Sequence, residues 1–409
     1  MHIAHFTNTY HPVTSGVVRS VSSFRQALTA LGHNVFIFAQ ADRDYHDKEP
    51  FIFRYPALHL PLQEYPLTIP VSGFVDTLLP SLKLNVIHSH HPALLGQVAV
   101  RKAEALKVPL VFTHHTRYRE YSHYAVGLPQ GLAKQVIDRW IGDYMAHCQH
   151  IVAPSESIKQ LLAETYGISE GITVVPTGID LSLYEQAEGS AIRRRHGWGD
   201  DMVLISIGRL AKEKNWETLL TAVQPLIQNR PNIRLVILGE GEERGELETV
   251  ATELGIARRV QLLGSVPFDS VPRYLKAADI FCFASVTETQ GLVTLEALAA
   301  GLPVVAVTAT GTADAVTDGV EGLLTPNDSS ALFQALQRLV DDAELRQKLA
   351  AAAPNKATEF DLDKQAKRLV TVYEEAVEAK KAGFQIRTDI QKPIFSLDWR
   401  ELLDSVSND

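Results

Sequence analysis

Cysteine is scarce in this sequence, and long apolar runs are missing. The two cysteines among 409 residues, Cys148 and Cys282, lie beside apolar segments and lack the spacing of metal ligands. Isolated cysteines of this kind are typical of buried thiols in a reducing compartment. No apolar run is long enough to cross a bilayer, and residues 1 to 6 lack the basic start of a signal peptide. We therefore expect a cytoplasmic protein, with peripheral attachment to the inner face of a membrane left open.

An excess of basic residues is also missing. The chain has 39 Lys and Arg against 48 Asp and Glu, a net charge of −9. Residues 1 to 180 contain 14 of each sign, so the whole imbalance, 25 against 34, follows residue 180. An acidic region is a poor nucleic-acid surface, so no nucleic-acid partner is expected. The length and the 45% hydrophobic content favour two globular domains of Rossmann size.

A strand, a loop and a helix are predicted around Glu288. Residues 279 to 284 form a short apolar run, whereas residues 291 to 300 have helical periodicity. Glu288 lies in the loop and Glu296 in the helix, with Gly291 between them. A glycine at a helix start lets backbone N–H groups approach an anion closely. A ligand with a diphosphate in its middle would meet one carboxylate at each end, which describes a nucleotide sugar.

At these residues the chain resembles a known family. Glu288 and Glu296, with seven residues between them, are similar to the Glu-x7-Glu signature of the retaining nucleotide-sugar glycosyltransferases of family four. The segment Glu288-Thr-Gln-Gly-Leu292 departs from that family's usual Phe before Gly. Gln290 instead resembles the bacterial diacylglycerol α-glucosyltransferases. The resemblance implies that Glu288 binds donor-sugar hydroxyls and Glu296 the ribose, with Gln290, Gly291 and Leu292 also at the donor.

The resemblance runs from the first strand to about residue 380 and implies an α/β fold of the GT-B type. That architecture has two facing Rossmann-like domains with mostly parallel sheets and an interdomain cleft. We expect an acceptor-side domain over residues 1–180 and a donor-binding domain over residues 181–383, joined by a linker near residues 181 to 200. The apolar tail, residues 384–409, is expected to pack back toward the first domain; a surface-binding element is the alternative.

The second domain has a basic loop suited to a diphosphate. Gly208 permits a sharp exit from the strand at residues 203 to 207, and Arg209 and Lys214 follow before a helix. Two cations at a helix start bind a diphosphate well, and the acidic surroundings weaken the alternative of a solvated turn. The segment resembles the family's Gly-Arg-Leu-x-x-x-Lys motif, whose Arg and Lys hold the donor diphosphate. The same resemblance implies that the backbone at Val266 binds the base.

Histidines gather at two predicted strand ends in the first domain. His88 and His90 end one strand, and His114 and His115 follow another. A zinc site is not expected, because no acid at helical spacing accompanies them. The carboxyl ends of parallel strands meet at one sheet edge, so these residues would line the cleft. The resemblance selects His115 as the residue that contacts the donor sugar near the reacting carbon.

Two other loops are weaker candidates. Gly16, after the first strand, would let the donor approach the backbone, but an ordinary turn between strand and helix explains it equally well. Asp42 and Asp44 have the spacing of a metal-binding Asp-x-Asp. Nothing around them resembles a metal site, so a solvated loop is expected. We therefore predict no metal and no cofactor, since the nucleotide sugar is a substrate.

Cations and aromatic rings alternate directly after His115, at Arg117, Tyr118, Arg119 and Tyr121. Residues 101 to 139 hold seven Lys and Arg against three acids inside an otherwise neutral domain. Amphipathic rings and cations are typical of an anionic lipid surface. The segment therefore predicts a lipid acceptor and membrane contact, with a pocket for a soluble sugar as the alternative.

Together these residues and the family resemblance predict a retaining, metal-independent hexosyltransferase. It would transfer glucose from UDP-glucose to a membrane lipid such as diacylglycerol, in glycolipid biosynthesis. Transfer to a soluble acceptor, a nucleotide-sugar epimerase and a non-catalytic binding module are the alternatives. The oligomeric state stays open.

Overall fold

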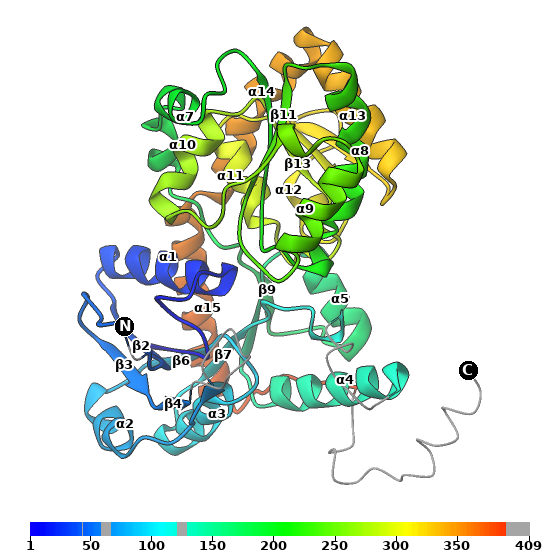
Figure 1. Ribbon diagram of the computed structural model, residues 1–409. Helices are drawn as coiled ribbons and strands as arrows, with labels where there is room; N and C mark the ends of the chain where they lie inside the picture. The colour runs from blue at the N-terminus through cyan, green and yellow to red at the C-terminus, as the bar shows by residue number, and fades with distance from the viewer. Residues whose placement is uncertain (43, 59–66, 121–128, 390–409) are drawn as a thin grey trace. The chain divides into compact units, whose positions relative to one another are not determined.

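The computed structural model describes residues 1–42, 44–58, 67–120 and 129–389 (Figure 1). The chain divides into two compact units, which are described separately. The first comprises Met1–Gly178 together with the chain from Asp363 onward, and the second comprises Ile179–Leu362. Among the described residues, no helix is both long and apolar enough to span a bilayer.

The first unit is built on a parallel sheet with strand order β3-β2-β1-β6-β7-β8-β9. Its strands are β1 (His2–Thr7), β2 (Asn34–Gln40), β3 (Ile52–Tyr55), β6 (Val86–Ser89), β7 (Leu110–Thr113), β8 (His150–Ala153) and β9 (Ile172–Val174). A separate antiparallel pair joins β4 (Ala57–Leu58) and β5 (Leu67–Thr68). Most residues of β2, β7 and β8 are apolar because helices cover both faces of the sheet, whereas β1 and β6 also contain the buried His5 and His88.

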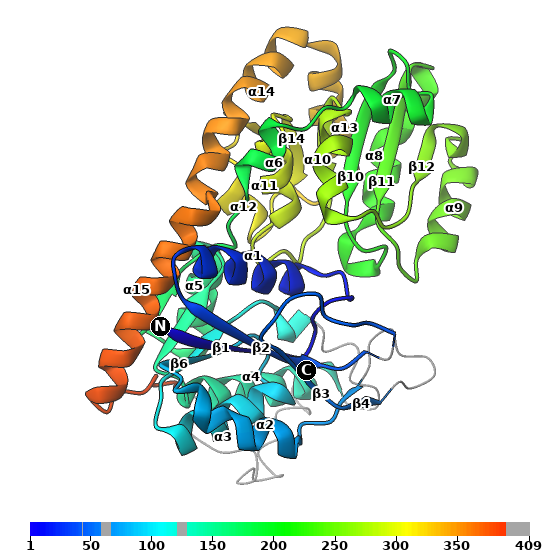
Figure 2. The ribbon, with the colours of Figure 1, turned by 90° about the vertical axis from the view of Figure 1, so that its left-hand side faces the viewer.

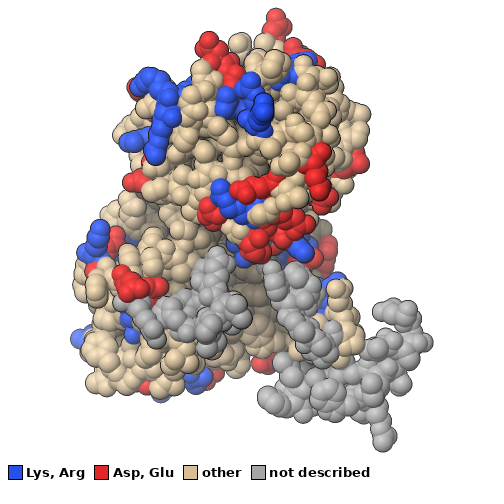
Figure 3. Space-filling model, in the orientation of Figure 1, with Lys and Arg blue, Asp and Glu red and all other residues tan. Residues whose placement is uncertain are grey.

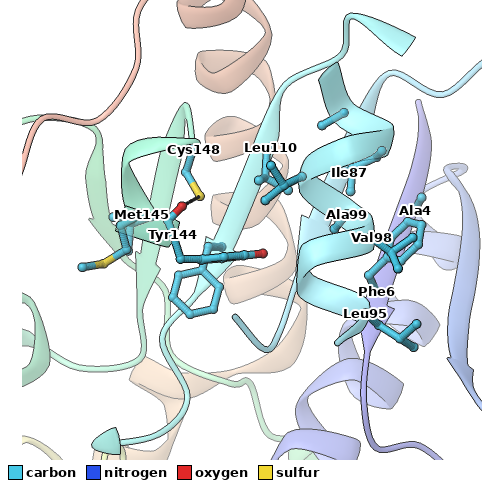
Figure 4. Close-up of a cluster of buried hydrophobic side chains, with 14 of the residues drawn as sticks. Ala4, Phe6, Ile87, Leu95, Val98, Ala99, Leu110, Tyr144, Met145 and Cys148 are labelled. Atoms are coloured by element: carbon cyan, nitrogen blue, oxygen red, sulfur yellow. Dashed lines mark hydrogen bonds between the residues drawn. The ribbon is translucent and has the colours of Figure 1, made fainter. Parts of the chain in front are cut away.

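The helices of this unit are α1 (Gly16–Ala30), α2 (Gly73–Leu78), α3 (Leu95–Leu106), α4 (Gln130–Ala146), α5 (Glu156–Tyr166) and α15 (Leu362–Lys381). Figure 2 shows α1 on one side of β1 and β2, and α2 and α3 on the other. Side chains alternate along a strand, so Ala4 and Phe6 of β1 pack against α3 (Figure 4). His5, which lies between them in sequence, therefore points to the opposite face.

The second unit contains a parallel sheet with strand order β12-β11-β10-β13-β14-β15. Its strands are β10 (Met202–Ile207), β11 (Ile233–Leu238), β12 (Val260–Leu262), β13 (Ile280–Phe283), β14 (Val304–Val307) and β15 (Gly322–Thr325). Its helices are α6 (Leu181–Glu185), α7 (Ser190–His196), α8 (Trp216–Asn229), α9 (Arg244–Glu253), α10 (Val271–Lys276), α11 (Leu292–Ala299), α12 (Thr312–Ala315), α13 (Ser329–Asp341) and α14 (Ala343–Ala357). Two buried apolar clusters pack within this unit. The predicted pair of parallel, Rossmann-like sheets is confirmed.

The end of the chain joins the first unit earlier than the sequence predicted. Residues 363 to 389 group with that unit, whereas the sequence predicted that residues up to 383 belong to the second domain. Tyr373 of α15 is fully buried there, and its hydroxyl is 2.7 Å from His88 Nδ1. The N–H of Ile386 donates to the carbonyl of Cys148 at 2.9 Å, and Phe384 packs on the same core. The tail through residue 389 thus lies against this unit, while residues 390–409 fall outside the described residues.

The predicted linker contains two short helices, α6 and α7. Tyr184 and Ile192 anchor them in one apolar cluster of the second unit, together with Trp198. Each helix contributes few apolar anchors, which explains why the sequence showed no clear periodicity there.

Candidate functional site

The loops after β10 and β13 are brought together by the strand order of the second sheet. β13 lies next to β10, although β11 and β12 come between them in sequence. The chain therefore winds outward in opposite directions from these two strands. In open α/β sheets, ligands bind at the carboxyl ends of the strands at such a switch point. The basic motif lies in the first of these loops, and the Glu-x7-Glu motif begins in the second and ends in α11.

Backbone packing fixes the loop that carries Arg209. The N–H of Leu210 donates to the carbonyl of Glu240 at 2.9 Å. Gly239 has a φ of 152°, and a Cβ there would lie 1.8 Å from the carbonyl oxygen of Gly208. Only glycine fits so close to another backbone segment. The turn after β11 thus supports the turn after β10.

A salt bridge joins the two predicted motifs. Lys214 Nζ lies 2.6 Å from Glu288 Oε1, to which the Ser285 hydroxyl also donates at 2.8 Å. The Glu288 side chain is 14% exposed. Burial alone would raise the pKa of Glu288, but the charge of Lys214 and the hydrogen bonds from Lys214 and Ser285 outweigh it and lower that pKa. Glu288 is therefore a carboxylate at neutral pH.

Arg209 also has a carboxylate partner. It forms an ion pair with Glu213, four residues later in the same loop, and its own side chain is 32% exposed. Both predicted diphosphate cations thus contact acids. Acidic and basic side chains also intermingle on the surface where α9 lies (Figure 3), as in the pairs of Arg244 with Glu240 and Glu248. These ion pairs explain why Lys and Arg side chains occur in a region with an excess of acidic residues.

The loop after β14 supports the loop after β13. The Thr310 hydroxyl donates to the carbonyl of Glu288 at 2.7 Å. A Cβ on Gly311 would lie 2.4 Å from the backbone nitrogen of Gln290. Gly291, with a φ of 72°, is the N-cap of α11, so the first N–H groups of that helix begin beside Gln290. The loop after β14 therefore supports the backbone N–H groups that the sequence predicts to bind an anion.

Glu296 is more deeply placed than the other predicted donor residues. Its side chain is fully buried on α11, and the Tyr184 hydroxyl donates to Glu296 Oε1 at 2.9 Å. Gln290 is also buried, and Val266 packs against the same apolar cluster. The ribose contact of Glu296, the base contact of Val266 and the donor contacts of Gln290, Gly291 and Leu292 stay predictions.

In the first unit, His115 follows β7 and is partly buried beside other histidines. His115 Nε2 lies 2.9 Å from His90 Nδ1. Burial, with smaller contributions from His91, His114 and His5, lowers the pKa of His115 to about 3. His115 is therefore neutral at physiological pH and suited to hydrogen bonding rather than to holding a charge. Its contact with the donor sugar stays a prediction.

Gly16 begins α1, where the Ser15 side chain accepts from the N–H of Val18 at 3.2 Å. A Cβ on Gly16 would meet nothing within 4 Å, so the fold of this unit does not itself require glycine there. Asp42 Oδ1 accepts from the N–H of Asp44 at 3.1 Å, an ordinary turn contact. Among the described residues, the group that could hold a metal is His5, His88 and His90.

The predicted membrane segment is more internally paired than its sequence indicated. Arg117 contacts Glu120 at 2.9 Å, and Arg119 contacts Asp138 at 3.5 Å. Tyr118 packs against the core of the unit. Arg119 is 53% exposed and stays available to a surface partner. Tyr121 lies outside the described residues.

Several site residues were missed in the sequence, some of them because their partners are distant. Ser285 contacts Glu288 and was detectable within its own loop, but Tyr184 meets Glu296 across 112 residues. Tyr373 meets His88 across 285 residues. His5 had one local signal, a polar ring inside a buried strand.

Glu288 predicts a defined pH dependence of stability. Its folded pKa is lowered, so its carboxylate stabilises the fold above the unfolded pKa of about 4.3, and this is lost as pH falls through the folded pKa. We expect Glu288→Gln to be less stable than the parent at pH 7, with a gap that narrows below about pH 4. Urea unfolding of both proteins from pH 7 to pH 3 measures it. A gap of constant size over that range would contradict the ion pair.

Comparisons with known proteins agree on one family. Residues 14–183 match the model of "Glycosyltransferase Family 4", and residues 190–356 match "Glycosyl transferases group 1". An alpha-monoglucosyldiacylglycerol synthase from Acholeplasma laidlawii is 31% identical over 319 residues, covering 75% of this chain and 80% of that protein. A D-inositol 3-phosphate glycosyltransferase from Thermobispora bispora is 33% identical over 310 residues, covering 72% of each.

Solved structures show the same fold at lower identity. HepE from Anabaena, in complex with UDP and glucose, is 20% identical with a TM-score of 0.75, covering 91% of this chain and 99% of that one. Sucrose-phosphate synthase from Thermosynechococcus elongatus is 22% identical with a TM-score of 0.76, covering 92% and 99%. At these identities the likeness concerns the fold alone.

Proposed function

Because this chain belongs to glycosyltransferase family four and has the GT-B fold, we propose that it transfers glucose from UDP-glucose to a hydroxyl of a membrane lipid, with retention of anomeric configuration. The observation that carries the proposal is the contact of Lys214 with Glu288 at 2.6 Å. It joins the predicted diphosphate cation to the predicted sugar-binding carboxylate. A nucleotide sugar needs both functions a few ångströms apart.

The proposed chemistry is mainly electrostatic. The acceptor oxygen forms a bond to the anomeric carbon as the bond from that carbon to the diphosphate breaks. Negative charge then grows on the leaving diphosphate, where Arg209, Lys214 and the N-terminus of α11 stabilise it. The proton of the acceptor hydroxyl passes to the departing phosphate oxygen, since no residue is assigned as the general base. With cations from the protein in this role, no metal is required.

The donor assignment rests on chemistry and on relatives. Glu288 is ionised and hydrogen-bonded at one oxygen, which suits it to accept hydrogen bonds from sugar hydroxyls. The HepE structure named above contains UDP and glucose, and a second HepE structure contains UDP-glucose. These two complexes support uracil as the base and glucose as the sugar of the proposed donor.

The acceptor divides the relatives. Synthases of alpha-monoglucosyldiacylglycerol and D-inositol 3-phosphate glycosyltransferases match at 31% and 33% identity. Gln290 before the glycine of α11 favours the diacylglycerol enzymes, as does the alternation of Arg117, Tyr118 and Arg119. Transfer to a soluble sugar or inositol phosphate is the competing proposal.

One experiment tests donor, acceptor and metal together. We expect UDP-glucose to raise the melting temperature most among a panel of nucleotide sugars, and glucose to reach diacylglycerol in mixed micelles with chelator present. Product analysis without acceptor separates an epimerase, which releases free sugar or its epimer. Transfer only to soluble acceptors would overturn the lipid assignment. If chelator abolishes turnover and magnesium restores it, Asp42 and Asp44 must be reconsidered as metal ligands.

Membrane attachment makes a separate prediction. The double variant Arg117→Glu and Arg119→Glu reverses two charges, and near an anionic surface each cation contributes about 1 kcal/mol. We expect the parent to sediment with anionic vesicles at low salt and the variant to stay in the supernatant. Lys159→Glu on α5 is the matched control, since it also reverses an exposed charge of this unit. Equal sedimentation of all three proteins would place the membrane contact elsewhere.

A further inference from the structure

Buried polar side chains in the first unit form a continuous hydrogen-bonded chain that ends at His115. Its members come from β1, β6, β7 and α15 and from the residues that follow β6 and β7. They are, in order of contact, Thr113, His88, Tyr373, His5, His90 and His115. All six residues lie in the part of the protein that the structure describes.

The half nearest His115 consists of stacked imidazoles. His90 Nδ1 is 2.9 Å from His115 Nε2, and His90 Nε2 is 2.8 Å from His5 Nδ1. The rings of His5 and His90 are 5.0 Å apart and tilted by 11°. Both ring nitrogens of His90 therefore lie between two other imidazoles, and the ring cannot turn without breaking a contact.

The far half is anchored by α15. The Tyr373 hydroxyl is 2.7 Å from His88 Nδ1 and 3.5 Å from His5 Nε2. His88 Nε2 lies 2.7 Å from the Thr113 hydroxyl. Thr113 is two residues before His115, so the chain closes back on the strand that carries His115.

Burial dictates the protonation of the chain. His5, His88 and His90 are buried, and burial lowers the pKa of each, to about 3 for His5. A neutral imidazole has one donor nitrogen and one acceptor nitrogen. Each ring that uses both nitrogens must therefore accept at one and donate at the other. If His90 donates to His115, then His90 must accept from His5, and the reverse holds as well.

The tautomer of His115 is thus tied to its neighbours. From His5 to His115 only two arrangements satisfy every contact, one with the donors directed toward His115 and one with them directed away, so His115 changes tautomer only if His90 and His5 change with it. In each, His90 fixes which nitrogen of His115 carries the proton, because the hydrogen bond at one ring nitrogen sets the state of the other. A lone histidine at a strand end would exchange between both tautomers.

A metal at the same place is the rival interpretation. One nitrogen from each of His5, His88 and His90 lies within 4.8 Å of the others. These nitrogens already take part in the contacts above, however. A bound ion would have to displace a hydrogen bond of each of the three rings. The hydrogen-bonded chain needs no such rearrangement.

We propose that His5, His90 and Tyr373 are positioning residues that hold His115 in one tautomer and one orientation toward the transferred sugar. This rests on the proposed function, because the predicted contact of His115 with the donor sugar requires that the protein transfers a sugar. Misplacing a group that contacts the substrate by about 1 Å costs roughly a hundredfold in rate. UDP lacks the sugar, so the affinity for UDP should not depend on His115.

Three variants test the chain. His90→Leu removes both contacts, His90→Gln restores one donor and one acceptor, and Tyr373→Phe removes the anchor on α15. His150→Gln is the control, because His150 on β8 is also buried and contacts Thr173 at 2.9 Å outside the chain. We expect His90→Leu to lower kcat for glucose transfer about ten- to a hundredfold with unchanged UDP affinity. His90→Gln should recover part of the loss, Tyr373→Phe should lose less, and the control should match the parent.

Nitrogen-15 NMR of the histidine rings gives a readout that needs no turnover. In the parent we expect His115, assigned with a His115→Gln sample, to be one neutral tautomer at pH 7.5, and in His90→Leu a mixture of both. If the parent transfers no sugar but His90→Leu still changes the His115 spectrum, the proposed function is wrong and the hydrogen-bonded chain is still supported. An unchanged His115 spectrum and unchanged kcat in His90→Leu would overturn the proposal. So would stoichiometric zinc in the purified protein that is lost in His90→Leu.

Discussion

Arg209→Ala is expected to reduce kcat/KM for glucose transfer by roughly 30- to 1000-fold, and Lys214→Ala by a similar factor. The range corresponds to about 2–4 kcal/mol, the usual cost of removing a group that stabilises charge developing in a transition state. Both cations lie in the loop after β10, where the switch point of the sheet places a ligand. Removing Lys214 also leaves Glu288 without its ion-pair partner.

Lys212→Ala is the matched control for these variants. Lys212 belongs to the same loop, but its side chain is exposed, and it is not part of the family's motif. The control should keep nearly full activity, and circular dichroism should show all three variants folded. If Arg209→Ala and Lys214→Ala both stay within a few-fold of the parent, the diphosphate is bound elsewhere.

Local sequence was sufficient for the strands that precede the candidate loops, although β3, β4, β5 and β15 were not predicted. Apolar runs such as residues 280 to 283 read as strands because both faces of a parallel sheet are covered. The motifs at Arg209 and Glu288 could be placed after strands for the same reason. Their contact through Lys214 could not be derived, because it depends on β13 pairing with β10 rather than with β12.

Contacts between segments that are distant in sequence could not be predicted from local sequence patterns. The sequence showed Glu296 on a helix with good helix formers, but not that Tyr184 of α6 would donate to it. The sequence also predicted the last long helix in the second domain, because nothing in residues 364 to 381 indicates that Tyr373 contacts His88. The helix groups with the first unit, where the Tyr373 hydroxyl is buried against His88.

The histidines show how a pattern can be recognised and its partners missed. His88, His90 and His115 were identified at strand ends, where neighbouring parallel strands open at one edge. His5 was overlooked because it lies within a strand rather than after one. Side-chain alternation along β1 turns His5 away from the cluster of Ala4 and Phe6 and toward His90.

Gly311→Ala is expected to lower the melting temperature by several degrees and to weaken UDP-glucose binding at least tenfold. A Cβ there would lie 2.4 Å from the nitrogen of Gln290 and 2.7 Å from the carbonyl carbon of Thr289. These are backbone atoms, which cannot rotate away as a side chain can. The loop that carries Glu288 must therefore move. Overpacking of this kind costs about 1–3 kcal/mol, and each kcal/mol lowers the melting temperature by roughly 2–4 °C in a unit of this size.

Gly319→Ala separates the clash from the strain of a left-handed backbone. Gly319 has a φ of 76° and Gly311 a φ of 28°, but a Cβ on Gly319 would meet nothing within 4 Å. The control should therefore lose only the stability that a left-handed alanine costs, about 1–2 kcal/mol, and should bind UDP-glucose as the parent does. Differential scanning fluorimetry with and without UDP-glucose measures both effects. If Gly311→Ala binds the donor with parental affinity, residues 288 to 292 are not part of the donor site, because no variant that displaces their backbone could leave that site unchanged.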